Sequence, residues 1–413
     1  MYKYGVFIFF YLPLLHNEEF SFKESQIDIS KFDYVIFNDT LINSKAIITI
    51  PKTITNLYLC SGIDMEKILK VCNDTTVTNL VFSTNFNCRL PPSLIPSNIT
   101  NITFGDKFNC NLEIGSLPKH LEQLVFGSSF NCWLSPGQLP DSLQSITFGE
   151  SFTVGFGVGS LPLNLRKLKS TIMNYHFGVT PDTLPPKIEK IIGFAVLIDD
   201  KLMPKTIKHI SLSPVKNMKN CHYTIPLNLT SLCLFRFDFK PSILLLPLTL
   251  KKLNLGFYDK ELELGFIPNS VKRLNLGYAF NQYLYPKILP NTIRWLKFPD
   301  TYNIPFEEGS IPEGVTTLIL NTKISLQTAP LAIVEQLTIS QSVTLEQFKT
   351  IPKSVKIIHY QRNDKDDQFE IKRIDVDDRW LVIHKKNEFG GFIKSTEQLA
   401  KVLQFRVTVT STT

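Results

Sequence analysis

The stretches IPSNITNITFG (residues 95–105), LPKHLEQLVFG (117–127) and LPDSLQSITFG (139–149) align without gaps at a period of 22 residues. When the Pro of each repeat is numbered 0, apolar residues recur at positions +3, +6 and +8, and a Gly follows at +9. Such a period is typical of solenoids, in which each repeat is one coil that packs on its neighbours. The repeat therefore decides the fold.

The same register extends over most of the chain. An Ile, Leu or Met precedes the Pro in most repeats, and two repeats keep the apolar pattern without a Pro. The fifteen starts, spaced 19 to 23 residues apart, are Pro51, Asp74, Pro96, Pro118, Pro140, Pro162, Pro185, Pro204, Pro226, Pro247, Pro268, Pro290, Pro312, Leu331 and Pro352.

Each repeat has the signature of one short strand. The apolar residues at +6 and +8 alternate with a polar one, which indicates that one face of the strand points inward. Pro has no N–H to give to a sheet, so it marks the corner that leads into the strand. The Gly at +9 marks the exit, where a Cβ would clash.

We therefore predict a β-rich solenoid, a leucine-rich-repeat-like stack of about fifteen coils with one parallel sheet, over residues 46–360. A single coil cannot bury its own apolar edge, and the two ends of the stack need caps. We expect residues 1–45 to form an N-terminal cap, for which a helix is one option, and residues 361–413 to form a C-terminal capping segment.

A second motif follows the strand. Phe-Asn pairs stand at positions +12 and +13 in several repeats, for example Phe108-Asn109 and Phe130-Asn131, and an apolar residue stands at +16. Residues one period apart lie above one another, so the pattern predicts a stacked Phe column and a stacked Asn column. Asn amides in such a column can satisfy backbone groups of the turns, which makes their role structural.

The Ile/Leu-Pro pair, the strand pattern and the Phe-Asn pair together resemble the FNIP repeat, a 22-residue relative of the leucine-rich repeat known chiefly from social amoebae. The resemblance covers about residues 50–360 and is most specific from Phe82 to Pro162. Cys88, Cys110 and Cys132 replace the Gln that usually follows Phe-Asn. The resemblance implies a curved or twisted solenoid and a role in protein interaction, and it carries no catalytic residues.

Composition and targeting signals leave two locations open. The net charge of +7 is modest for 413 residues, and the seven Cys show neither a disulfide framework nor zinc spacing. The apolar run at residues 6–15 is too short to span a bilayer, and no small-residue cleavage site follows it. We expect a cytoplasmic protein, with a secreted or cell-surface glycoprotein as the alternative if residues 1–16 act as a signal peptide.

No residue pattern predicts an enzyme. The thiols of the Cys88, Cys110 and Cys132 column would lie about 5 Å apart, but three small side chains in one column are better explained by packing. The run from Gly155 to Gly159 falls in a return segment, without a helix to bind a phosphate. No Ser or Cys nucleophile lies in a recognisable elbow, so we expect no catalytic site, cofactor or metal.

The outward strand positions +4, +5 and +7 carry the strongest functional hint. They are neutral or acidic in the early repeats and become basic from the sixth repeat on. This stripe suits either simple solubility or the binding of an acidic partner, most plausibly a protein, and we expect neither nucleic acid nor a stable membrane span. The candidate face comprises Arg166, Lys167, Lys169, Lys190, Lys208, Lys251, Lys252, Lys272, Arg273, Arg294, Trp295 and Lys297.

Overall fold

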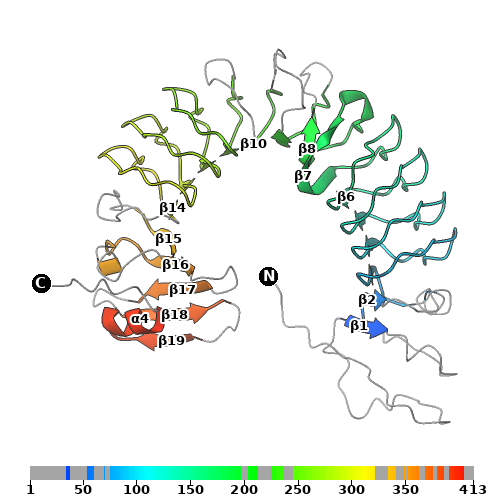
Figure 1. Cartoon of the computed structure of the whole chain (residues 1–413), viewed down its shortest axis with the longest axis horizontal. Helices are drawn as coiled ribbons and strands as arrows, with labels where there is room; N and C mark the ends of the chain where they lie inside the picture. The colour runs from blue at the N-terminus through cyan, green and yellow to red at the C-terminus, as the bar shows by residue number, and fades with distance from the viewer. Residues whose placement is uncertain are drawn as a thin grey trace, which may run out of the picture. The chain divides into compact units, whose positions relative to one another are not determined.

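The chain folds into two compact units, Met1–Cys221 and His222–Thr413, and each is a stack of coils (Figure 1). The division falls within the range predicted as one solenoid. The computed structural model describes residues 34–37, 54–59, 69, 75–196, 203–212, 225–235, 245–320, 334–340, 348–349, 351–361, 368–374, 379–385 and 390–403.

The described residues of the first unit form nine strands, and each pairs in parallel with the next. A short 3-10 helix, η3 (Pro181–Thr183), lies between β7 and β8. The strands are β1 Tyr34–Phe37, β2 Asn56–Leu59, β3 Asn79–Phe82, β4 Asn101–Thr103, β5 Gln123–Val125, β6 Ser145–Phe148, β7 Lys167–Val179, β8 Lys190–Val196 and β9 His209–Leu212.

The second unit begins with parallel strands and ends with antiparallel ones. Pairing is parallel from β10 to β16 and antiparallel from β16 to β19. The elements are β10 Ser231–Leu234, β11 Lys252–Asn254, β12 Arg273–Asn275, β13 Trp295–Lys297, β14 Thr317–Ile319, β15 Gln336–Ser340, β16 Ile357–Gln361, β17 Gln368–Arg373, β18 Trp380–His384, β19 Gly390–Ile393 and helix α4 Thr396–Leu403.

The predicted repeat register is confirmed. A strand follows each of the fifteen predicted starts, from β2 to β16. The solenoid has about 11 turns, fewer than the fifteen coils expected, and the return segments of several coils lie outside the described residues. Within the expected N-terminal cap, Tyr34–Phe37 form a strand that pairs in parallel with β2, so these four residues extend the sheet and are not helical.

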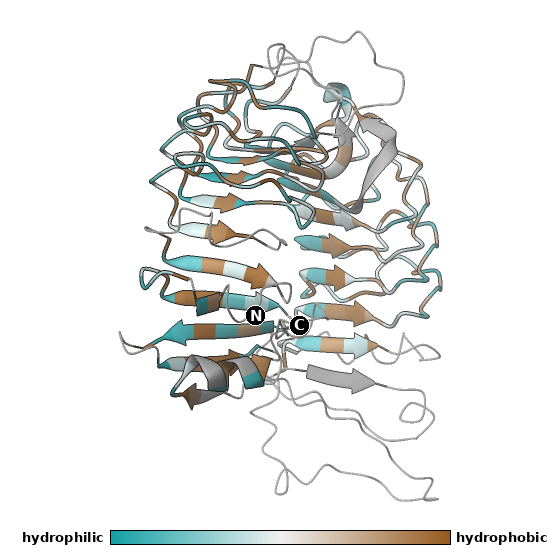
Figure 2. Cartoon of the chain, turned by 60° about the vertical axis from the view of Figure 1, so that its left-hand side comes forward, coloured by the Kyte–Doolittle hydropathy of each residue, from teal (hydrophilic) through white to brown (hydrophobic). Residues whose placement is uncertain are grey.

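The core follows the repeat pattern. Ile99, Ile102 and Phe104, at +3, +6 and +8 of one coil, are at most 2% exposed, and hydrophobic and hydrophilic segments alternate along the strands in Figure 2. The carbonyl of Pro96 accepts a hydrogen bond from the N–H of Ile99 at 3.2 Å, and Pro118 and Leu121 repeat this turn at 3.1 Å. The Pro therefore closes the corner that leads into each strand.

Phe side chains form two neighbouring stacks inside the first unit. Within a coil, the rings of Phe104 and Phe108 are 4.0 Å apart, and those of Phe126 and Phe130 are 3.7 Å apart. Between coils, Phe104 and Phe126 are 5.6 Å apart with nearly parallel planes. Such aromatic pairs contribute about 0.5–1.5 kcal/mol beyond their buried area. The Phe columns thus bind each coil to the next.

The Asn column satisfies backbone donors, as predicted. Asn87 Oδ1 accepts a hydrogen bond from the N–H of Asn109 at 2.9 Å, and Asn109 Oδ1 accepts one from Asn131 at 2.9 Å. Asn131 Oδ1 continues the ladder to Thr153 at 2.8 Å. Each amide therefore fixes the register of the return segment one coil further along.

Regular coils give way to a longer strand at one point. Strand β7 has 13 residues, and its pairing with β8 shifts register between Lys169 and Asn174 and again before Gly178. This coil lacks both the Phe-Asn pair and the Gly at +9, so neither feature turns the chain out of the strand. The return segment is strand here instead of loop.

Candidate functional site

The structure places the predicted basic residues in two groups, one in each unit. Arg166, Lys167, Lys169, Lys190 and Lys208 lie on or next to β7, β8 and β9 in the first unit. Lys251, Lys252, Lys272, Arg273, Arg294, Trp295 and Lys297 lie on or next to β11, β12 and β13 in the second unit. Within each group, the backbone pairing brings residues one coil apart side by side.

In the first unit, part of the positive charge is neutralised. Arg166 Nη1 lies 2.7 Å from Glu189 Oε1, where Glu189 occupies the same +4 position one coil further along. Lys167 pairs with Lys190 in the sheet, and Lys190 pairs with His209. Lys167 and Lys190 therefore lie side by side next to an ion pair.

In the second unit, the cations form two adjacent columns. At position +4, the N–H of Lys272 donates to the carbonyl of Lys251 at 2.9 Å, and the N–H of Arg294 donates to that of Lys272 at 2.9 Å. At position +5, Lys252 pairs with Arg273, which pairs with Trp295. Each column therefore places basic residues directly beside one another.

Four of these cations have no counter-charge among the described residues. The side chains of Lys251, Lys252, Lys272 and Lys297 make no ion pair or hydrogen bond with any described residue. Neighbouring strands are about 4.8 Å apart, so each like-charge pair costs up to about 1 kcal/mol in water. This repulsion does not stabilise the fold, and the arrangement suits either solubility or the binding of an acidic partner.

Three residues of the second group have defined contacts. The Arg273 guanidinium lies 4.7 Å from the ring centre of Trp295, a cation–π contact that holds both side chains in place. Arg294 Nη1 donates to the carbonyls of Asn291 (2.8 Å), Ile293 (3.1 Å) and Gly314 (3.3 Å). Arg294 therefore acts mainly in the turn and contributes less to a binding surface than its sequence position suggested.

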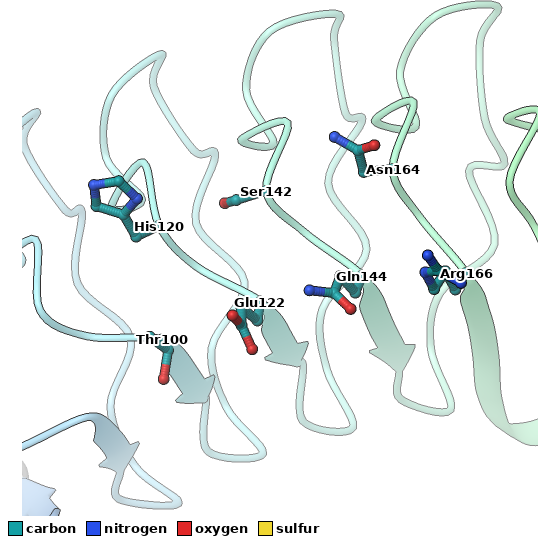
Figure 3. Close-up of a pocket in the computed structure, with 7 residues that line it drawn as sticks. All are labelled: Thr100, His120, Glu122, Ser142, Gln144, Asn164 and Arg166. Carbon is teal, nitrogen blue, oxygen red and sulfur yellow. The ribbon is translucent and has the colours of Figure 1, made fainter.

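A shallow hollow in the first unit was not predicted from the sequence. It encloses about 360 Å³, and its lining side chains come from positions +2 and +4 of four successive coils (Figure 3). The lining residues are Thr100, His120, Glu122, Ser142, Gln144, Asn164 and Arg166.

The polar groups of this hollow are largely committed to the fold. Ser142 Oγ donates to the carbonyl of Leu121 at 2.7 Å, and Asn164 Nδ2 donates to that of Asp141 at 2.8 Å. Asn164 Oδ1 accepts a hydrogen bond from Lys187 at 2.7 Å. The hollow is therefore a by-product of bonds between coils and is a weaker candidate than the basic columns.

The Ser142 bond belongs to a ladder at position +2 that sequence reasoning missed. Small polar side chains there donate to the position +3 carbonyl of the preceding coil, at 2.7–3.0 Å. The signal was the recurrence of Asn, Ser or Thr one residue before the +3 apolar position. The donors are Thr76, Asn98, Ser142, Thr206, Thr249 and Thr292.

The Cys column is held by the Asn column. Cys110 Sγ donates to Asn87 Oδ1 at 3.2 Å, and Cys132 Sγ donates to Asn109 Oδ1 at 3.3 Å. Burial raises the pKa of the Cys110 and Cys132 thiols, and the neighbouring Cys raises each further. The protonated thiols thus serve as donors, which favours the structural interpretation over a reactive site.

No group of three or more His, Cys, Asp or Glu in the described ranges could hold a metal ion. None of the helices in the described part of the chain is long and apolar enough to cross a membrane. The run from Gly155 to Gly159 is loop that ends in a turn, and both of these Gly have a φ of +78°.

Comparison with known proteins agrees with the repeat and the fold. The FNIP Repeat family matches residues 86–129, 108–151 and 258–301. A solved structure, described as that of CroV588, a novel circular LRR protein, superposes with a TM-score of 0.57 at 24% identity. The match covers 81% of this chain and 54% of that one, so this chain spans about half its length. No curated protein is similar enough to count as a match.

Proposed function

Because the chain is an FNIP-repeat protein with a leucine-rich-repeat-like solenoid fold, we propose that it is a non-catalytic scaffold that binds an acidic partner protein. The binding surface is the basic face, which we define as Lys251, Lys252, Lys272, Arg273, Trp295 and Lys297. The observation that supports it is that Lys251, Lys252 and Lys272, which lie in two adjacent columns of the second unit, have no ion pair or side-chain hydrogen bond with a described residue.

An acidic partner would relieve the repulsion within this face. Its carboxylates would supply the counter-charges that the described residues of the chain do not, and the repulsive cost would turn into attraction on binding. Lys251, Lys252, Lys272 and Arg273 are exposed, so they can reach a partner without rearrangement of the core. Association through such a face is expected to be fast and strongly weakened by salt.

The first unit has a smaller part in this proposal. Lys167, Lys169, Lys190 and Lys208 remain a second contact region for acidic groups, beside the Arg166 and Glu189 ion pair. Because Glu189 would repel a carboxylate, we assign this region a weaker contribution than the basic face.

We propose the cytoplasm as the site of action. The thiols of Cys110 and Cys132 act as hydrogen-bond donors, a role that only the reduced form can fill. In an oxidising compartment, thiols on adjacent coils would tend to form disulfides. This is tested by labelling free thiols with a maleimide in protein isolated from cells without a reducing agent. Labelled Cys110 and Cys132 are expected, and a disulfide between neighbouring coils would contradict the proposal.

The basic face is tested by matched charge reversals. A fluorescein-labelled poly-glutamate peptide serves as the probe, and its dissociation constant is measured by anisotropy over a series of salt concentrations. The double variant Lys252→Glu and Arg273→Glu is compared with Lys260→Glu and Lys287→Glu, which change net charge equally but lie on return segments.

The first variant is expected to weaken binding by about tenfold or more at low salt, since each reversal replaces an attraction with a repulsion. The control pair is expected to change it by less than about threefold. Equal weakening in both pairs would mean that only net charge matters, and the proposal would be wrong. A single-stranded RNA oligonucleotide that outcompetes the peptide would point to nucleic acid instead.

A further inference from the structure

An exposed aromatic cluster lies at the ends of the strands that carry the basic face. Phe235 directly follows β10, and Phe257 and Tyr278 occupy position +10 after β11 and β12. The Phe257 ring lies 4.9 Å from that of Phe235 and 5.3 Å from that of Tyr278. Phe257 is 40% exposed and Tyr278 58%. We call these three residues the aromatic cluster.

The fold does not require aromatic residues at this position. Position +10 is Asp106, Ser128, Glu150 and Asp300 in other coils with the same Pro and strand register. Most buried aromatic residues stand at +8 and +12, and Tyr258, directly after Phe257, is buried at +11. Large exposed aromatic residues gathered in one place, where a polar residue would serve the coil equally well, are typical of a binding surface.

The turns that carry the cluster are fixed by the strands below them. Asn254 Oδ1 accepts a hydrogen bond from the N–H of Gly256 at 2.9 Å, and Asn275 repeats this with Gly277 at 2.9 Å. Both Gly have positive φ, 63° and 96°. The aromatic rings are therefore presented at a set distance from Lys252 and Arg273, which begin the same two strands.

We propose that the second unit recognises an acidic segment of a partner protein that carries one apolar anchor side chain, with the carboxylates on the basic face and the anchor on the aromatic cluster. This inference rests on the proposed function and specifies the partner. Phe257 stands five positions after Lys252, so a partner segment would have to place its anchor on the order of 10–15 Å from its contact with Lys252.

A protein segment fits this surface better than a nucleic acid. Single-stranded nucleic acid also combines charge with stacking, but it brings a phosphate with every base. Asp300 occupies position +10 in the coil next to Tyr278, and Asp259 lies two residues after Phe257; both are exposed. These carboxylates would repel phosphates at the stacking site, whereas an apolar side chain at the end of an acidic stretch meets no such repulsion.

The test uses the full chain and a set of short labelled peptides rich in Glu. One peptide has Ala at every neutral position, and in the others a single Phe is moved through each position in turn, so that no spacing is assumed. Binding is measured for wild type, for Phe257→Ala with Tyr278→Ala, and for Tyr285→Ala, a control that removes an aromatic residue 51% exposed on a return segment of the same unit.

We expect the best Phe peptide to bind wild type about tenfold more tightly than the Ala peptide. Phe257→Ala with Tyr278→Ala should reduce this ratio to about one and leave the Ala peptide unchanged, whereas Tyr285→Ala should preserve the ratio. A wild-type ratio near one at every Phe position would overturn this inference, although binding of the Ala peptide would still support the basic face. Failure of all peptides to bind would overturn both. If an RNA oligonucleotide binds more tightly than every peptide and loses affinity in Phe257→Ala with Tyr278→Ala, the surface binds nucleic acid and the inference is wrong.

Discussion

Replacing Gly127 by Ala is expected to destabilise the first unit through a steric clash alone. A Cβ on Gly127 would lie 2.5 Å from the carbonyl carbon of Gly105 and 2.6 Å from Asp106 Cα, both backbone atoms of the preceding coil. Ordinary carbon contacts are about 3.5–4.0 Å, so the two turns would have to separate by about 1 Å. Because backbone cannot rotate aside, we expect a loss of about 3 kcal/mol, at the upper end for overpacking.

Gly137→Ala is the matched control in the same coil. Its φ is +83°, and only Ile114 Cδ1, at 3.8 Å, lies near the added Cβ. Ala there meets open space but must adopt the left-handed conformation, which costs about 1–2 kcal/mol. The pair separates a clash between coils from conformational strain within one coil.

The free energy of unfolding of both variants is measured by urea denaturation with far-UV circular dichroism. Hydrogen exchange of the amides in β4 and β5 gives the local effect, since solenoids can lose cooperativity between distant coils. Gly127→Ala should be the less stable variant and should lose protection in both strands. If Gly127→Ala lies within about 0.5 kcal/mol of wild type, the coils are not held at the spacing described above and the reasoning is refuted.

Two further predictions concern hydrogen bonding and pH. Asn109→Ala removes the acceptor for the N–H of Asn131 and the thiol of Cys132, and should lower the free energy of unfolding by about 1 kcal/mol. Asn109→Asp keeps the acceptor and should lose less; equal losses would contradict the ladder. Burial lowers the pKa of His359 from its ordinary value of 6.5, Lys385 lowers it further, and Glu370, whose Oε2 lies 3.8 Å from Nδ1, opposes them. The unfolded chain then takes up this proton more readily, so stability of the second unit should fall as pH drops below 6.5 toward the folded-state pKa. His359→Gln should make that fall smaller in denaturation curves, and an unchanged pH dependence would exclude this residue as its source.

The repeat pattern predicted most of the first unit because backbone and core obey the same period. The inward positions of each coil, the Pro corner and the Phe and Asn columns depend only on which residues lie one period apart. A clash at Gly127 was predicted because the chain leaves the strand there, and the structure shows that the neighbour is the Gly at the same position one coil earlier. A feature that repeats with the coil can be identified from the sequence.

Features that depend on individual side chains were harder to predict. Arg294 has the same position as Lys272, but its longer planar group reaches three carbonyls of the turn, which no periodic pattern indicates. The ion pair of Arg166 with Glu189 could have been predicted from the sequence, because both residues occupy position +4 in successive coils. Strand β7 is longer where the repeat loses its turn-forming residues, so the repeat pattern could not predict where this strand ends.

The change from parallel to antiparallel pairing after β16 has a consequence for self-association. Similar coils stacked in parallel end in an outer strand whose unpaired N–H and C=O groups could pair with a coil of another molecule. Head-to-tail addition of this kind gives open-ended polymers and not closed oligomers. Strands β17, β18 and β19 reverse direction, and Gly390–Ile393 is followed by α4, which packs against that last strand. A chain shortened to end at Gln361 would expose β16 and should form concentration-dependent polymers by this route.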